Sequence, residues 1–147
     1  MPDTFTNLTC HFVFSTKERL PLLTRAVRPT LFSYMAGTVN RVGGVAIIVG
    51  GVRDHVHLVV RMSPSLSAAD VMRTVKASSS KWMNERRTNS KFGWQAGYGA
   101  FSVSQSMVAV VTNYVKNQEE HHRRRSFADE IAVLCERHGA ICRPSGA

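Results

Sequence analysis

The chain has 147 residues, 44% apolar and 20% charged, which fits one compact domain and excludes a large multidomain enzyme. Lys and Arg number 19 against 10 Asp and Glu, so the net charge is +9 and a polyanionic partner is expected, although charge alone does not separate DNA from RNA or a membrane surface. No apolar run approaches the ~20 residues that span a bilayer, and the first residues lack the features of a secretion signal, so we expect a cytoplasmic protein without membrane contact.

The first half of the chain predicts a strand, a helix and a hairpin. Residues 4–16 alternate apolar and polar side chains, as a half-buried strand does. Apolar residues at near-helical spacing over 24–42 predict a helix that stops at Gly43. Two apolar, β-branched runs over 45–52 and 55–62, separated by turn-forming residues, predict an antiparallel hairpin.

The second half predicts helices around one short strand. Residues 67–87 carry an apolar face with a basic flank and indicate an amphipathic helix, and residues 100–104 suit a last strand. A second strongly periodic helix is predicted over 107–122. Ser126, with a carboxylate three residues later as in a capping box, begins a closing helix that stops at Gly139.

The predicted order, βαββαβαα, favours an α+β fold. It is typical of a ferredoxin-like (RRM-like) plait, with a mostly antiparallel sheet and helices packed on one face. We predict a single domain over 1–147, with a core over about 5–125 and a C-terminal helix over about 126–139. The cysteines are odd in number and lack metal-ligand spacing, which predicts free thiols: Cys10, Cys135 and Cys142.

Two histidines two residues apart begin the strand predicted over 55–62. Side chains at that spacing point to the same face, so His55 and His57 project together while Val56 faces the other side. Two imidazoles can share one divalent cation. The competing explanation is two histidines on an exposed sheet face by chance, because this motif is weak by itself.

The helix predicted over 107–122 adds a phenol and an amide. Tyr114 and Gln118 lie four residues apart and therefore share one helix face. The amide oxygen of Gln118 is a hard ligand that suits Mg²⁺ or Mn²⁺, and with two imidazoles it would leave coordination positions open for a phosphate. Tyr114 would then be the nucleophile. Each residue taken alone is more simply explained as a partly buried helix tyrosine and a solvated glutamine.

Four strings in order resemble a known family: HVHLVV after the hairpin, SSSKW on the next helix, WQAGYGAFSVS, and NYVKNQEEHH. Together they are similar to the single-tyrosine HUH transposases of the insertion-sequence 200/605 group, including their domesticated repeat-associated relatives. The similarity runs from about His11 to about Arg125, most of the chain.

The resemblance assigns roles to the residues that match the family motifs. The family's two metal-binding histidines match His55 and His57, its nucleophilic tyrosine matches Tyr114, and its metal-binding glutamine matches Gln118. His122, with His121 beside it, lies one turn beyond this glutamine and could approach the ion, but the resemblance favours a surface role for both.

The family further implies an obligate homodimer on a ferredoxin-like fold, acting on single-stranded DNA hairpins, with each tyrosine often serving the partner subunit's site. A divalent ion, Mg or Mn, would polarise the scissile phosphate, and Tyr114 would attack it to leave a 3′-hydroxyl and a 5′-phosphotyrosine. A second 3′-hydroxyl can reverse this step without ATP. The chain accordingly has no string that resembles a nucleotide-binding P-loop.

Basic residues on or after the helix predicted over 67–87, and after the tyrosine helix, are candidates for contacts with the DNA backbone. Each is individually more simply explained as a solvated charge, so the prediction concerns the group. The candidates are Arg73, Lys76, Lys81, Arg86, Arg87 and Arg123.

Two other functions fit the same residues. One is a non-catalytic or domesticated nucleic-acid-binding protein on the same fold, in which the histidines only line the sheet. The other is a small metal-dependent phosphodiesterase that uses water as its nucleophile. A covalent protein–DNA adduct that disappears in Tyr114→Phe would distinguish the transposase from both.

Overall fold

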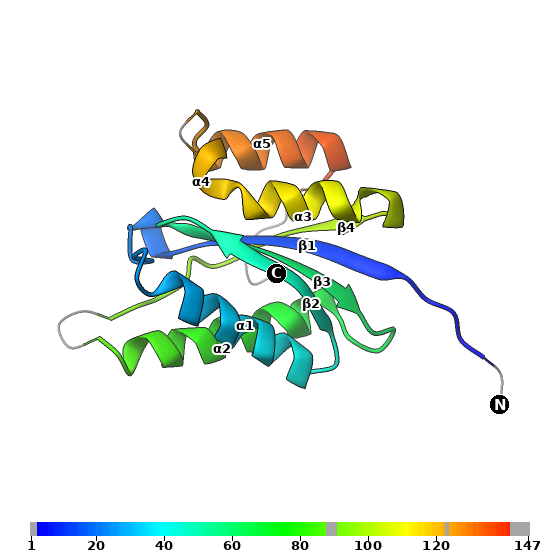
Figure 1. The fold of residues 1–147 in the computed structure, drawn as a ribbon, viewed down its shortest axis with the longest axis horizontal. Coiled ribbons are helices and arrows are strands. Elements are labelled where there is room, and N and C mark those ends of the chain that lie inside the picture. Colours follow the sequence, from blue (N-terminus) through cyan, green and yellow to red (C-terminus); the bar gives the residue numbers. More distant parts are fainter. Residues whose placement is uncertain (1–2, 88–90, 123, 142–147) are drawn as a thin grey trace.

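The computed structural model describes residues 3–87, 91–122 and 124–141 (Figure 1). Its strands and helices, in chain order, are β1 (Leu8–Ser15), α1 (Arg28–Arg41), β2 (Val45–Gly51), β3 (His55–Met62), α2 (Ala68–Asn84), β4 (Gly99–Val103), α3 (Val108–Lys116), α4 (Gln118–His121) and α5 (Phe127–His138). Short 3₁₀ turns precede α1 and α3, at Lys17–Arg19 and Gln105–Met107. Among these helices, none combines the length and apolar character that a bilayer span requires.

The four strands form one sheet in the order β2-β3-β1-β4, and every neighbouring pair is antiparallel. With the chain order βαββαβ through β4, this is the ferredoxin-like plait, and the predicted α+β class is confirmed. The two central strands, β1 and β3, pair residue by residue, with Val13 opposite His57. The beginning of β3 therefore lies in the middle of the sheet rather than at an edge.

Helices cover both faces of the sheet, whereas the sequence predicted them on one face only. Figure 1 shows α1 and α2 against one face and α3, α4 and α5 against the other. The reason lies in β3, where the residues from His55 to Val60 are all buried, so neither face of this strand can be left to solvent. The histidines of β3 consequently lie under a layer of helices.

The apolar core fills the space between the sheet and the α1/α2 layer. β1 contributes Phe12 and Phe14, and β3 contributes Val56, Leu58 and Val60, all at most 1% exposed. Because side chains alternate along a strand, the residues between them point to the opposite face. This alternation directs the histidines of β1 and β3 away from the core and towards α3–α5.

The predicted ends of the closing helix are confirmed, whereas α1 begins at Arg28 rather than at residue 24. Ser126 Oγ accepts from the backbone N–H of Asp129, and Gly139 ends α5 in the left-handed region with a φ of 58°. The helix predicted over 107–122 is interrupted at Asn117, whose ψ of 29° is outside the helical range, so Gln118 begins the separate helix α4.

Cys10 and Cys135 are free thiols as predicted, and Cys142 lies outside the described residues.

Gly50 in β2 sets how closely α3 approaches the sheet. A Cβ atom there would meet the Val115 carbonyl oxygen at 2.7 Å and its Cγ1 at 2.9 Å. We therefore expect Gly50→Ala to move α3, which carries Tyr114, and to lower the free energy of unfolding by about 1–3 kcal/mol. Denaturant unfolding measures this loss.

Gly37 in α1 is the matched control for Gly50. A Cβ there meets only the end of the flexible Arg41 side chain, at 3.6 Å. Because alanine is the better helix former, Gly37→Ala should leave stability unchanged or raise it by up to about 1 kcal/mol. Equal effects of the two substitutions would contradict the close packing of α3 on β2.

Candidate active site

His55 and His57 project together from β3, on the face covered by α3–α5, and both side chains are 0% exposed. The Nδ1–H of His55 donates to Asp54 Oδ1 at 2.8 Å, and His57 Nδ1 shares a hydrogen bond of 2.7 Å with His11 Nε2. A hydrogen bond at one ring nitrogen orients an imidazole and frees its other nitrogen. Both Nε2 atoms are thereby turned towards one point.

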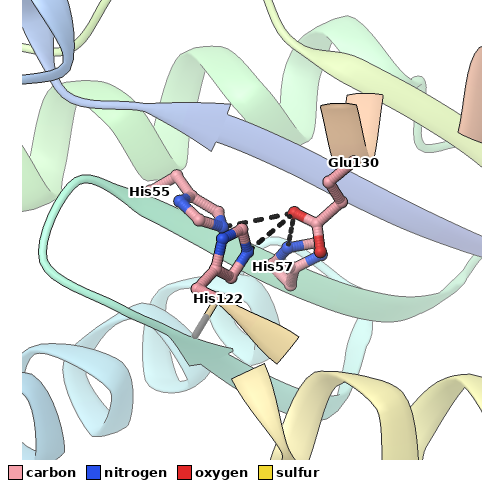
Figure 2. A group of neighbouring side chains, drawn as sticks. All are labelled: His55, His57, His122 and Glu130. Carbon is pink, nitrogen blue, oxygen red and sulfur yellow. Dashed lines mark hydrogen bonds and ion pairs between the residues drawn. The ribbon is translucent and has the colours of Figure 1, made fainter. Parts of the chain in front are cut away.

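Glu130 of α5 meets the two histidines at that point (Figure 2). Its Oε1 lies 2.9 Å from His57 Nε2, 3.3 Å from His55 Nε2 and 3.2 Å from the Nε2 of His122. Glu130 is 2% exposed and is the buried residue of α5. We call His55, His57, His122 and Glu130 the histidine cluster; one ligand atom from each lies within 4.8 Å of the others.

Gln118 also lies against the histidine cluster. Its Oε1 is 3.3 Å from His55 Nε2 and 3.1 Å from His122 Nε2, and its amide N–H donates to the Tyr114 carbonyl oxygen at 3.3 Å. The side chain is 1% exposed, so the alternative of a solvated glutamine is wrong. The structure thus brings together the three side chains predicted as metal ligands.

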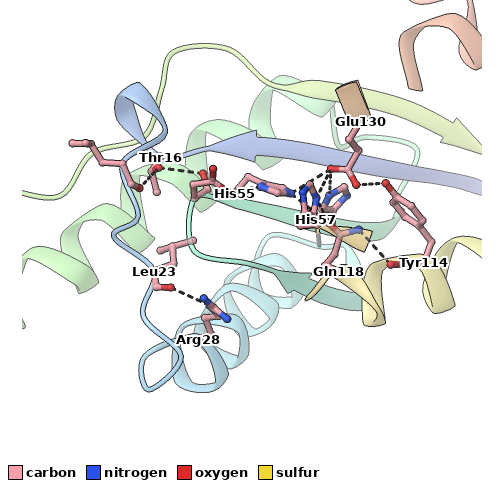
Figure 3. A network of polar contacts seen from close by, with 11 residues as sticks. Thr16, Leu23, Arg28, His55, His57, Tyr114, Gln118 and Glu130 are labelled. Atoms are coloured by element: carbon pink, nitrogen blue, oxygen red, sulfur yellow. Dashed lines mark hydrogen bonds and ion pairs between the residues drawn. The ribbon is translucent and has the colours of Figure 1, made fainter. Parts of the chain in front are cut away.

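Tyr114 of the same chain lies beside the cluster (Figure 3). Its hydroxyl donates a hydrogen bond to Glu130 Oε2, the second oxygen of the carboxylate whose Oε1 contacts the histidines. The phenol ring stands edge-on to His57, with 5.7 Å between ring centroids, and the ring of His121 lies 4.6 Å away. One carboxylate therefore connects the phenol oxygen to the histidines.

The donor atoms fit a divalent metal ion in type and spacing. Ligand atoms bound to one ion at about 2.1 Å lie about 3.0–3.4 Å apart in octahedral or tetrahedral geometry. The contacts of the imidazole nitrogens with Glu130 Oε1 and Gln118 Oε1, 2.9–3.3 Å, are of this size, and the ligand atoms of the histidine cluster all lie within 4.8 Å of one another. Imidazole nitrogens with carboxylate and amide oxygens suit ions such as Mn²⁺, and the bonds to Asp54 and His11 supply the outer contacts that fix such ligands.

The charges at the site depend on one another. Burial by itself raises the pKa of Glu130, but hydrogen bonds from His122, His55 and His57 hold it far below its usual value, so the carboxylate is ionised. Burial by itself lowers the pKa of His55, yet the hydrogen bonds to Asp54 and Glu130 leave it raised overall. Burial dominates at His57 and lowers its pKa. A negative carboxylate therefore faces one histidine that favours its charged form and one that favours its neutral form.

The phenol of Tyr114 is held in its protonated form. Burial, and then the hydrogen bond to the negative Glu130, raise the pKa of Tyr114 well above its usual value. A positive charge added at the histidine cluster would oppose this shift, because it stabilises a nearby phenolate. The reactivity of this hydroxyl consequently depends on what the cluster binds.

Because His11 is buried, we predict that the metal-free protein loses stability as the pH falls. Burial, with the neighbouring His57, lowers the pKa of His11 to about 3, against ~6.5 in an unfolded chain. Between these values only the unfolded chain binds the proton, so the free energy of unfolding falls as the pH falls. In a chelator, we expect a loss of about 2 kcal/mol between pH 7 and pH 5 from this group.

His11→Gln isolates this contribution, because glutamine can hydrogen-bond to His57 but does not titrate. Denaturant unfolding of the variant should depend less steeply on pH than that of the wild type. His55, whose pKa is raised, works in the opposite direction and is present in both proteins. Parallel pH profiles would show that His11 titrates normally in the folded state.

Sequence reasoning missed Glu130 and His11 and misjudged His122. Glu130 falls on the apolar stripe of the closing helix, between Phe127 and Ile131, where a carboxylate needs a buried partner, and this signal could have found it. The surface role favoured for His122 is wrong, since its side chain is 11% exposed and contacts Glu130. The ring of His121 lies on Tyr114 rather than in the cluster.

The basic candidates on or just after α2 lie on the other side of the sheet from the histidine cluster. Arg73 pairs with Asp70 at 2.6 Å, and Arg86 stacks over the Trp82 ring at 3.7 Å. Lys76 Nζ donates to the carbonyl oxygens of Gln95 and Gly97, at 2.8 Å and 2.5 Å, and so ties α2 to the segment before β4. A role in DNA binding stays a prediction for these three and for Lys81 and Arg87, while Arg123 lies outside the described residues.

Comparison with known proteins gives a family and two similar folds. A family model described as "Transposase IS200 like" matches residues 4–118. A crystal structure of a candidate transposase from Deinococcus radiodurans R1 has 21% identity and a TM-score of 0.65, covering 80% of this chain and 95% of that one. A REP-associated tyrosine transposase bound to a REP hairpin has 13% identity and a TM-score of 0.59, covering 83% of this chain and 73% of that one. No curated protein matches the sequence.

Proposed function

Because the chain belongs to the IS200-like transposase family, whose members cut DNA in transposition, we propose that it too cuts DNA. In this proposal it cuts and rejoins single-stranded, hairpin-containing DNA ends through Tyr114. The observation that supports the proposal most is the continuous contact from the Tyr114 hydroxyl through Glu130 to His55 and His57. In this proposal the nucleophile and the metal ligands therefore lie within one chain.

In this proposal His55, His57 and Gln118 hold a divalent ion, Mg or Mn, with His122 and Glu130 close enough to share in binding it. When bound, such an ion polarises the scissile phosphate and stabilises charge that develops on its oxygens. Asp54 and His11 keep the two imidazoles in the orientation that this binding needs. The layer of α3–α5 covers His55 and His57, which are fully buried.

Tyr114 supplies the nucleophile. Its oxygen forms a bond to phosphorus while the bond from phosphorus to the 3′-oxygen breaks, which leaves a 5′-phosphotyrosine and a strand that ends in a 3′-hydroxyl. Glu130 Oε2 accepts the hydrogen bond of the phenol and so orients the attacking oxygen. In the proposed step the phenol proton is released to solvent, and the departing 3′-oxygen takes up a proton from solvent. The reverse attack by a 3′-hydroxyl rejoins strands, because one phosphate ester replaces another.

The substrate and assembly form part of the same proposal. A net charge of +9 suits a nucleic acid, and the similar REP-associated tyrosine transposase is bound to a REP hairpin, which supports a DNA hairpin as ligand. We propose a homodimer acting in the cytoplasm, with residues 1–147 forming one domain. Tyr114 lies at the histidine cluster of its own chain, which favours attack within the subunit in the state described.

The test is a covalent adduct with DNA. Single-stranded oligonucleotides that cover palindromes flanking the coding region are labelled at either end and incubated with the protein and Mn²⁺. We expect an adduct that survives denaturation, carries the 3′-end label and is absent in chelator, because the tyrosine retains the strand that begins with the cut phosphate. The 5′-labelled fragment should be released with a free 3′-hydroxyl.

The alternatives give different results in the same assay. A non-catalytic binding protein retards the oligonucleotide without cutting it. A phosphodiesterase that uses water cuts without forming an adduct and keeps its activity in Tyr114→Phe. Either result, obtained with DNA that the protein binds, would reject the proposed strand transfer.

A further inference from the structure

The cavities that reach the active site divide into two groups. Two of them, of about 450 and 420 Å³, are lined by Tyr114 and Glu130. Two others, of about 310 and 570 Å³, are lined by His122 and by Gln118 respectively, and Tyr114 lines neither. Figure 3 shows Tyr114 and Arg28 on opposite sides of the histidines. The site is thus open on the side of the nucleophile and also on a side without it.

The cavity of about 310 Å³ is rich in arginine, and we call it the arginine pocket. Its lining is Arg25, Arg28, Val52, Arg53, Glu119 and His122. Three guanidinium groups face a single carboxylate, that of Glu119, which lies 3.2 Å from Arg28 and 3.8 Å from Arg25. In the part of the chain that the structure describes, Arg53 takes part in no ion pair within 4.0 Å, although its charge helps to lower the pKa of Asp54. The pocket therefore has an excess of positive charge beside the histidine cluster.

Arg28 is held in place within this pocket. Its side chain is 13% exposed, and its Nε–H donates to the Leu23 carbonyl oxygen at 3.0 Å. Burial lowers the pKa of Arg28, Glu119 opposes this change, and the positive charges of Arg25 and Arg53 add to it. Like charges gathered around a fixed guanidinium destabilise one another, and an anion bound among them removes that repulsion.

The adjoining cavity of about 570 Å³ offers room for a base. It shares Arg25, Arg28 and Glu119 with the arginine pocket and adds apolar surface from Phe32 and Ile48. A phosphate site next to an aromatic and apolar surface is the combination by which proteins bind unpaired nucleotides. This pairing favours a single DNA strand over a free inorganic anion.

We propose that the arginine pocket binds a backbone phosphate of the departing DNA strand, the one that keeps the 3′-hydroxyl. The inference rests on the proposed function and on the geometry of displacement at phosphorus, where attacking and leaving oxygens lie roughly in line on opposite sides. Attack by Tyr114 from one side directs the 3′-oxygen to the other, where this pocket lies. Retention there keeps the 3′-hydroxyl near the phosphotyrosine for rejoining.

Binding is tested without catalysis, with a hexathymidylate that has a 5′-fluorescein and a free 3′-hydroxyl. We expect the double variant Arg25→Gln/Arg53→Gln to bind the probe at least about 10-fold more weakly at low salt. The slope of log affinity against log salt should fall by about 0.7 for each phosphate that the variant no longer neutralises. The control is Arg61→Gln, at an exposed arginine at the far end of β3. It removes one positive charge, whereas the double variant removes two, and it should change neither the affinity nor the slope.

A second probe locates the strand. It carries 4-thiothymidine as its 3′-terminal nucleotide, and after irradiation we expect crosslinks to peptides from residues 25–32, 48–53 or 115–122, which contain the residues that line the two cavities. Equal weakening in Arg61→Gln and the double variant, or crosslinks confined to residues 124–141, would overturn the proposal.

The two proposals fail separately. If the wild type forms the covalent adduct but the arginine variants bind and crosslink normally, only the pocket is rejected. If the wild type forms no adduct with DNA that it binds, the proposed function fails and the role in holding a departing strand fails with it.

Discussion

Tyr114→Phe should abolish the covalent protein–DNA adduct and lower strand cleavage by about 10³-fold or more, because removing the nucleophile of a covalent mechanism removes the whole step. The substitution deletes one oxygen and retains the ring packed against His57 and His121. Glu130 keeps its contacts with His55, His57 and His122, so the fold should change little. Gel analysis of labelled oligonucleotides under denaturing conditions measures both adduct and cleavage.

Tyr98→Phe is the matched control. Tyr98 is 43% exposed and lies in the segment before β4, so the loss of its hydroxyl should leave both adduct and cleavage unchanged. Binding of Mn²⁺ to Tyr114→Phe should also persist, because the phenol is not among the expected ligands. Cleavage that survives in Tyr114→Phe at the wild-type rate would mean that water is the nucleophile.

His57→Ala should remove both metal binding and activity. We expect Mn²⁺ to stabilise the wild type against thermal unfolding, by about 2.7 kcal/mol at a concentration 100 times its dissociation constant. His57 Nε2 lies 2.9 Å from Glu130 Oε1, and its loss leaves a single imidazole on β3, which should weaken the binding of the ion enough to remove its effect at this concentration. The thermal shift with Mn²⁺ should therefore vanish, together with adduct formation.

His138→Ala controls for the loss of an imidazole, because His138 is exposed on α5 and packs on Phe101 outside the histidine cluster. Its Mn²⁺-induced shift should equal that of the wild type. Comparison of Gln118→Ala with His122→Ala then identifies the third ligand, since both side chains reach the site. An unchanged shift in His57→Ala would exclude this metal site.

The sequence by itself predicted the plait because its signals are local. The apolar, β-branched run over 55–62 forms β3, and the capping serine at position 126 begins α5. His55 and His57 share one face of the sheet because side chains two residues apart on a strand point in the same direction. The family resemblance, carried by strings in order along the chain, is confirmed by the match over residues 4–118.

Only the tertiary structure decided what surrounds the two histidines. Glu130 lies 73 residues from His57 along the chain and His11 lies 46 residues from it, and no local period relates residues so far apart. Tertiary packing also decided three other features that local patterns did not predict. These are the helices on the second face of the sheet, the break at Asn117 and the burial of His122. Side-chain periodicity determines which face a residue occupies within its own element, whereas the packing of α5 on the sheet determines which carboxylate meets those imidazoles.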